Sequence, residues 1–490
     1  MKSKLWPWMG LWLGAWLCMP WTAGAQPLPT LRVAVQARAQ VPDLVCAAAP
    51  ERRRAPAPAN ADAPVPPDEA EVLAQLQQAQ TPDALPLPER PTGRWLQARE
   101  AGPLRVGIWG DSHLAAGFFT AELGRQLQTD ADQVQPRWLP ASMGRAGVRL
   151  PLRKTCVRGA WRYEPAHADP RWAVGVVPSL VSMSSAEPGA ALAWDLRLPD
   201  GRAQRQQLRL HYLQSDTPVQ LALRVDEGEA QTLTLPPGPA GPAVLELQGD
   251  APLSLIRLEL LQGPWRWSAL EMPLVPGTRL QLDVFGYPGA TVAGWKHVGP
   301  LASAPHGPDG PDEYDLVALA FGTNEGNVQP FDAAAYAQTL RQAVTAWRAR
   351  YPQAACLLIG PGDRGVLVKR PARKSRKSGR GPKTQAPKRG VDLLQFTRVH
   401  TEINRLQQAV AQEHGCRFWS MLQAMGGAGG AYRWQARQPA LMARDLIHFT
   451  VPGYQQLARQ LATDMGWEPA MLVPSAPSAP SPSSAPVNRP

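Results

Sequence analysis

The chain has 490 residues, 44% of them hydrophobic, and a formal net charge of +11. This length is enough for two or three folded domains, and the apolar content excludes a chain that is disordered throughout. Ten basic residues and no acidic one lie between Lys369 and Arg389, so the charge belongs to one segment and does not indicate a nucleic-acid-binding fold.

An export signal is predicted at residues 1–25. Lys2 and Lys4 precede an apolar run, and the small residues Ala23-Gly24-Ala25 provide a cleavage site before Gln26. The run is short and two prolines interrupt it, which favours a soluble periplasmic or secreted protein over a membrane-anchored one. No other segment is long and apolar enough to span a bilayer, so no transmembrane segment is expected after cleavage.

Residues 26–102 are interpreted as an N-terminal extension, with an Ala- and Pro-rich linker at 47–68 and a short helix at 68–80. Removal of the signal leaves an even number of cysteines, which permits two disulfides in an oxidising compartment: Cys46, Cys156, Cys356 and Cys416. Three pairings are possible, and the sequence does not choose among them. The cysteine spacing matches no zinc site, so no metal is expected.

Apolar runs alternate with helical segments in two parts of the chain, 103–149 and 278–472. Strands are predicted at 104–109, 283–285, 316–321, 355–360 and 416–419. Helices are predicted at 118–127, 331–350, 393–414 and 454–465. Continuous apolar strands separated by helices are typical of a parallel sheet that is covered on both faces. We therefore expect one α/β domain built from both parts, followed by a disordered Pro/Ser/Ala tail at 473–490.

Residues 150–277 have a different pattern. Short strands with alternating apolar residues are predicted at 191–198, 207–213, 220–225, 232–235, 244–247 and 253–260. This spacing predicts an antiparallel β-sandwich inserted into the α/β domain. Several tryptophans of the insert could stack on sugar rings, although alternating aromatic residues are more often core: Trp161, Trp172, Trp194, Trp265 and Trp267.

The candidate nucleophile is Ser112, in the turn Gly110-Asp111-Ser112-His113. It follows a buried strand and opens a helix, which places its side chain at the carboxyl edge of the sheet and its backbone N–H where an oxyanion could accept from it. A helix cap is the alternative role for this serine. We expect Asp111 to shape the turn and His113 to point away from Ser112.

Asp445 and His448 stand three residues apart, so the carboxylate can reach the imidazole Nδ1–H and His448 can take the proton of Ser112. Asn324, at the end of the strand 316–321, carries a side-chain amide that can donate to an oxyanion. The backbone N–H of Gly289 could approach the same oxyanion unobstructed. Taken singly, each residue is also explained as a cap, a turn residue or a surface histidine.

Together, in this order and each after a strand, these residues resemble the four sequence blocks of the SGNH (GDSL) hydrolase superfamily. The resemblance implies a three-layer α/β/α fold with a five-stranded parallel sheet. It implies that Ser112 is the nucleophile, His448 the base and Asp445 the residue that orients it. The oxyanion hole would consist of Ser112 N–H, Gly289 and Asn324, and no cofactor would be needed.

The surroundings of these blocks are similar to those of periplasmic peptidoglycan O-acetylesterases, on four segments: 110–120, Gly322-Thr323-Asn324-Glu325, 418–427 and 434–454. Members of that group carry a β-sandwich, resembling a carbohydrate-binding module, between the first and second blocks. The resemblance implies an exported esterase that removes 6-O-acetyl groups from muramoyl residues of peptidoglycan. The basic loop 369–390 and the Pro-rich tails depart from the group.

Two alternatives stay open at this point. One is an O-acetyltransferase of the same superfamily, which passes the acetyl group to an envelope polysaccharide. The other is a catalytically silent glycan-binding envelope protein that acts through the β-insert. The basic loop 369–390 is either a solvated, flexible insertion or a segment that contacts anionic envelope polymers electrostatically.

Overall fold

The computed structural model describes residues 30–35, 41–46, 64–79, 102–128, 130–176, 178–298, 314–369 and 391–467. The predicted signal, most of the linker, nearly all of the basic loop and the C-terminal tail lie outside these residues, so those predictions stay untested. Across the part of the chain that is described, no helix is long and apolar enough to cross a membrane.

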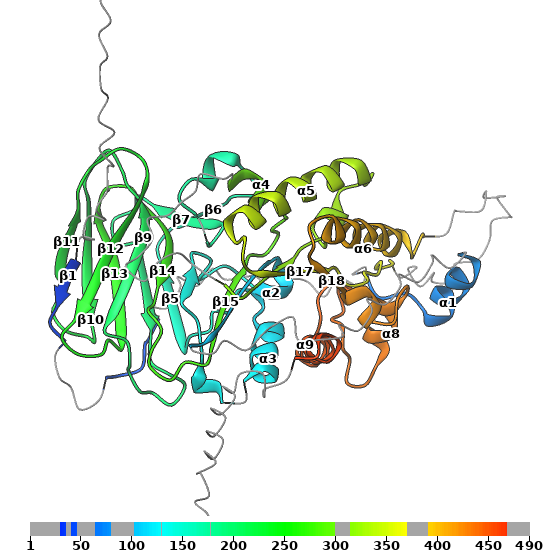
Figure 1. Cartoon of the computed structure of the whole chain (residues 1–490), viewed down its shortest axis with the longest axis horizontal. Coiled ribbons are helices and arrows are strands. Elements are labelled where there is room, and N and C mark those ends of the chain that lie inside the picture. The colour runs from blue at the N-terminus through cyan, green and yellow to red at the C-terminus, as the bar shows by residue number, and fades with distance from the viewer. Residues whose placement is uncertain are drawn as a thin grey trace, which may run out of the picture.

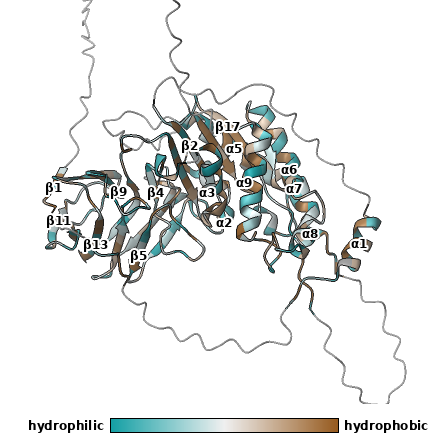
Figure 2. Ribbon diagram, turned by 90° about the horizontal axis from the view of Figure 1, so that it is seen from below, coloured by the Kyte–Doolittle hydropathy of each residue, from teal (hydrophilic) through white to brown (hydrophobic). Residues whose placement is uncertain are grey.

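A parallel sheet of six strands, in the order β18-β17-β16-β2-β15-β3, forms the centre of the α/β part. The strands are β2 (Leu104–Gly110), β3 (Val134–Gln135), β15 (Leu280–Gly286), β16 (Leu316–Ala320), β17 (Ala355–Gly360) and β18 (Arg417–Ser420). Five of them match the predicted strands. The predicted count of five was one too low, because the two-residue β3, which pairs with β15, is too short to leave an apolar pattern. Figure 2 shows β2 and β17 as predominantly apolar, as expected for strands buried on both faces.

Helices cover both faces of this sheet (Figure 1). On one face, α3 (Phe118–Leu127) and α9 (Val451–Met465) pack against each other and share a core with β2. The opposite face is covered by α4 (Ala293–Val298), α5 (Ala333–Arg350) and α6 (Gln395–Glu413). Two short helices follow strands directly, α2 (Ser112–Ala115) after β2 and α7 (Met421–Ala424) after β18, and a third, α8 (Gly430–Ala436), follows α7. The result is a three-layer α/β/α arrangement.

The β-rich part consists of two mainly antiparallel sheets that share one hydrophobic core. The first has the order β1-β12-β9-β14-β7-β6, with β4 also paired to β14, and the second the order β11-β10-β13-β8-β5. The bounds are β1 (Thr30–Val33), β4 (Trp138–Pro140), β5 (Lys154–Arg158), β6 (Arg162–Pro165), β7 (Val181–Ser185), β8 (Ala191–Asp195), β9 (Gln207–Leu213), β10 (Val219–Val225), β11 (Gln231–Leu235), β12 (Pro242–Gly249), β13 (Leu255–Gln262) and β14 (Trp265–Glu271).

Two of these strands come from outside the predicted insert. β1 belongs to the N-terminal extension, which also carries the helix α1 (Glu69–Gln78), and β4 precedes residue 150. Trp194, Trp265 and Trp267 are fully buried in the shared core, so they present no ring face to a sugar. The strands β1 and β4 were not predicted, because each is too short to show a periodic pattern of apolar residues.

Two disulfides connect distant segments of the chain. Cys46–Cys156 fastens the N-terminal extension to β5, and Cys356–Cys416 joins the start of β17 to the residue before β18. The structure thus selects one of the three possible pairings. The bonds close chain separations of 110 and 60 residues, and restricting the unfolded chain in this way stabilises a fold by roughly 4 kcal/mol per bond.

Candidate active site

The candidate nucleophile lies in a tight turn at the carboxyl end of β2. The strand ends at Gly110, and Asp111 caps α2 by accepting a hydrogen bond from the backbone N–H of His113 (2.9 Å). A Cβ at Gly110 would lie 2.5 Å from the carbonyl oxygen of Ala320 in the neighbouring strand, so the turn has no room for a side chain here. Ser112 therefore stands at the sheet edge where parallel α/β proteins carry their sites.

Ser112 is within hydrogen-bonding distance of a histidine 336 residues further along the chain. Ser112 Oγ lies 3.1 Å from His448 Nε2, and His448 Nδ1 lies 2.8 Å from Asp445 Oδ2. The other carboxylate oxygen of Asp445 accepts hydrogen bonds from the backbone N–H groups of Ile447 (3.0 Å) and His448 (2.9 Å). With its Nδ1–H directed at a carboxylate, His448 can offer Nε2 as a proton acceptor. These are the distances that a Ser–His–Asp triad requires.

A buried leucine fixes the turn that presents the last two side chains. The backbone of Leu446 has a φ of +57°, a value that residues other than glycine rarely adopt, and its side chain is fully buried. The backbone N–H of Gly365 donates to the carbonyl oxygen of Leu446 (3.0 Å). Thr450, and not Asp445, caps the following helix α9. Asp445 and His448 thus project from a constrained loop between the helices α8 and α9, which favours a role at the site over the alternative of a helix cap.

Asp445 and His448 also influence each other's ionisation. Burial opposes the charged form of Asp445, but the hydrogen bonds from the His448 side chain and from the backbone N–H groups of His448 and Ile447 together outweigh it and hold the pKa of this carboxyl well below its usual range. The same hydrogen bond raises the pKa of His448 above its ordinary value of 6.5, although partial burial acts against this. Over the described ranges, no three His, Cys, Asp or Glu side chains gather as metal ligands.

Two turns carry the predicted oxyanion-hole groups. Gly289 follows β15 with a φ of +86°, and a Cβ there would meet nothing within 4 Å, so the space beside it is open. Asn324 follows β16, and its side-chain amide donates to the carbonyl oxygen of Ala290 (2.8 Å). The backbone N–H of Tyr287 donates to the carbonyl oxygen of Gly110 (3.1 Å). These contacts bring Gly289 and Asn324 into one cluster with the nucleophile turn.

A carboxyl group that the sequence did not single out joins these two turns. Glu325 accepts hydrogen bonds from the backbone N–H of Val292 (2.9 Å) and of Gly322 (3.0 Å). Burial raises the pKa of Glu325 to about 7. In the sequence, only the position of Glu325 next to Asn324 indicates a role at the site. Its two hydrogen-bond donors cannot be predicted, because Val292 follows β15 and Gly322 follows β16. We infer that Glu325 positions the oxyanion-hole turns.

Glu325→Gln is expected to lower kcat for a small acetyl ester roughly tenfold, with a smaller change in KM. The amide nitrogen cannot accept an N–H, so one of the two backbone donors loses its partner at a cost of about 1–3 kcal/mol. Steady-state kinetics of the variant, beside Glu402→Gln on the exposed side of α6 as a control, measure the effect. An unchanged kcat in a folded variant would contradict the positioning role.

His113, next to the nucleophile, is buried against the histidine of the triad. Its Nδ1 lies 3.2 Å from the hydroxyl oxygen of Tyr454 on α9, and its ring centre lies 5.5 Å from that of His448. Burial lowers the pKa of His113 to about 3, so the ring is neutral and adds no positive charge beside His448. No local sequence pattern predicts this packing, because His113 and Tyr454 lie 341 positions apart in the chain.

Comparisons with known proteins concern the fold and the α/β part of the chain. Residues 261–456 match the model of the GDSL-like Lipase/Acylhydrolase family. A solved structure described as "Peptidoglycan O-acetylesterase in action" superposes with a TM-score of 0.53 at 21% identity, covering 76% of this chain and 93% of that one. A lipase/acylhydrolase from Enterococcus faecalis (TM-score 0.26, 16% identity, 41% and 80% covered) and a family two carbohydrate esterase from Clostridium thermocellum (0.24, 10%, 63% and 100%) are more distant. No curated protein sequence matches.

Proposed function

We propose that this chain is an ester hydrolase that removes O-acetyl groups from a glycan of the cell envelope through an acyl-Ser112 intermediate. The match of residues 261–456 to the model of the GDSL-like Lipase/Acylhydrolase family supports the hydrolase activity. The proposed substrate is peptidoglycan that carries 6-O-acetyl groups on its muramoyl residues. The observation that carries the proposal is the continuous series of hydrogen bonds from Ser112 through His448 to Asp445, at 3.1 Å and 2.8 Å.

The mechanism follows from these groups. His448 Nε2 takes the proton of Ser112 as the serine oxygen attacks the acetyl carbonyl, and Asp445 stabilises the imidazolium that forms. The N–H of Ser112, the N–H of Gly289 and the amide of Asn324 donate to the developing oxyanion. His448 then returns the proton to the departing sugar hydroxyl. A water molecule activated by the same histidine releases acetate from Ser112, and no cofactor takes part.

Two observations support the choice of a glycan outside the cytoplasm as the substrate. The fold is similar to that of a peptidoglycan O-acetylesterase over 93% of that structure. The disulfides Cys46–Cys156 and Cys356–Cys416 fit an oxidising compartment, as the predicted signal at 1–25 does. We therefore place the protein in the periplasm or outside the cell.

The test is incubation of the purified protein with O-acetylated peptidoglycan, with Ser112→Ala as the matched control. Release of free acetate by the wild type alone supports hydrolysis. Acetylated glycan acceptor without free acetate would identify an O-acetyltransferase instead. Glycan binding without either product, and unchanged in Ser112→Ala, would identify a catalytically silent binding protein.

Asn324→Ala is expected to lower kcat by roughly 10²–10³-fold. The substitution removes one oxyanion donor and also the hydrogen bond to Ala290 that ties this residue to the Gly289 turn. The effect should fall on kcat rather than on KM, because the oxyanion forms only in the transition state. Steady-state kinetics on a small acetyl ester measure both constants. A variant that loses only substrate affinity would argue against Asn324 as an oxyanion donor.

A further inference from the structure

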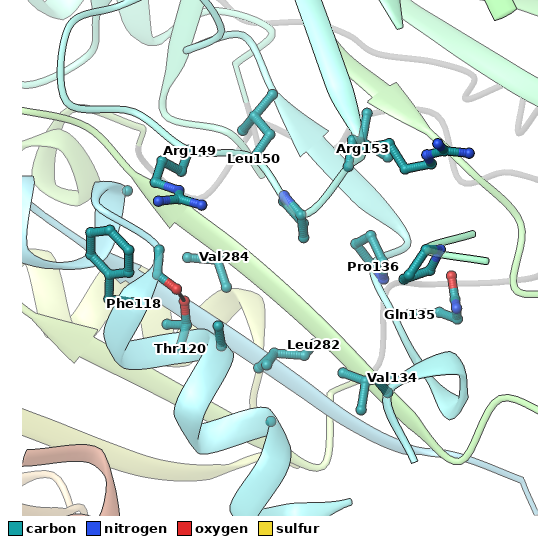
Figure 3. A pocket seen from close by; sticks show the side chains of 18 of the residues that line it. Phe118, Thr120, Val134, Gln135, Pro136, Arg149, Leu150, Arg153, Leu282 and Val284 are labelled. Atoms are coloured by element: carbon teal, nitrogen blue, oxygen red, sulfur yellow. Dashed lines mark hydrogen bonds between the residues drawn. The ribbon is translucent and has the colours of Figure 1, made fainter. Parts of the chain in front are cut away.

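A cavity of about 470 Å³ lies where the β-rich part meets the parallel sheet (Figure 3). Its walls come from α3, from β15 and from the segments 148–153 and 196–199. Most of the lining is apolar, and Leu150, Leu282 and Val284 face one another across it in Figure 3. A cavity of this size accommodates a small organic molecule.

The charges around the cavity are unevenly compensated. Five arginines line it, and three of them have carboxylate partners: Arg125 pairs with Glu122, and both Arg153 and Arg197 pair with Asp195. A fourth, Arg149, stacks over the ring of Phe118 at one end of the cavity, with 4.5 Å between the guanidinium carbon and the ring centre (Figure 3). The cavity is thus apolar with a cationic excess.

The fifth arginine, Arg205, is the most informative. It is 4% exposed, donates to the side-chain oxygen of Gln135 (2.6 Å) and, at 3.5 Å, to the carbonyl of Leu196, and its Nε has no hydrogen-bond partner. Within the described part of the chain, no carboxylate pairs with it. Burial lowers the pKa of Arg205 to about 10, which still leaves the group charged at neutral pH. A buried cation without a counter-charge is costly, and an anion at this position would offset that cost.

We propose that this cavity binds an amphipathic carboxylate, with its apolar tail between Leu150, Leu282 and Val284 and its carboxylate near Arg205. A charge-assisted hydrogen bond to the guanidinium would supply the missing counter-charge. A neutral apolar molecule would leave the charge of Arg205 without a counter-charge. A polar anion such as phosphate would pair with Arg205 but would make no apolar contact with the leucine and valine side chains of the walls. The proposal concerns a second site and does not depend on the esterase reaction.

Binding of decanoate to the full chain, measured by titration calorimetry beside decanol, tests the proposal. Decanoate is expected to bind at least tenfold more tightly than decanol, because only the carboxylate of decanoate supplies a negative charge to pair with the Arg205 guanidinium. Arg205→Met should raise the Kd for decanoate at least tenfold. The matched control is Arg153→Met, which lines the same cavity but removes a cation that already has partners, and it should change the Kd less than threefold.

A second variant keeps the test decisive if Arg205→Met does not fold. Leu150→Trp retains Arg205 and fills the cavity, so it should abolish decanoate binding. Three results would overturn the proposal: no decanoate binding by the wild type, equal affinity for decanol, or unchanged affinity in Leu150→Trp. The activity of these proteins on a small acetyl ester is measured in parallel, so failure at this site is distinguished from failure of the proposed esterase.

Discussion

Ser112→Ala is expected to lower kcat/KM for a small acetyl ester by roughly 10⁴-fold or more. The substitution removes the attacking oxygen and leaves His448 and Asp445 without a partner for proton transfer. The remaining rate would come from the oxyanion hole and from substrate binding alone. Initial rates with p-nitrophenyl acetate, and the melting temperature as a check on folding, measure the loss.

His448→Ala should cost about as much as Ser112→Ala, and the double variant hardly more than either one. The losses of activity from replacing two residues that act together are not additive, because without one of them the other no longer contributes to catalysis. His414→Ala, at the end of α6, serves as the control and should retain wild-type rates. Full activity of a folded His448→Ala protein would contradict the proposed triad, whereas additive losses would indicate two independent sites.

The parallel sheet was predictable because its strands are continuous apolar runs. The strands β2, β16 and β17 are buried on both faces, so their sequences differ sharply from the amphipathic helices around them. The short strands β1, β3 and β4 were not predictable, since segments of two to four residues have no measurable periodicity. Their positions depend on pairing with β12, β15 and β14, which only the folded chain brings near.

The candidate site shows the same division. Asp445 and His448 are three residues apart, so their contact follows from local geometry, and the distance between Ser112 and His448 is the one that their predicted roles need. Glu325 and Tyr454 escaped prediction because their partners lie on other elements. The catalytic roles themselves stay predictions, and their residues are the ones to replace first.

Asp445→Asn is expected to reduce kcat by roughly 10³–10⁴-fold while Ser112 and His448 stay in place. The amide can donate as well as accept, so it no longer requires His448 to direct Nδ1–H toward position 445. It also cannot stabilise the imidazolium that forms during the attack. Asp216→Asn, on an exposed turn of the β-rich part, should leave the rate unchanged and serves as the control.

The pH profile separates the charge of Asp445 from its role in orientation. His448 must be neutral to accept a proton, so kcat/KM should fall as the pH drops through the pKa of His448. In the wild type, the hydrogen bond with Asp445 raises that pKa above 6.5, so the acid limb should have its midpoint above 6.5. In Asp445→Asn the raising influence is lost and partial burial still favours the neutral ring, so the midpoint should move to lower pH. A reduced rate with an unchanged midpoint of the acid limb would mean that Asp445 orients His448 without raising its pKa. This result would contradict the proposal that Asp445 stabilises the imidazolium of His448.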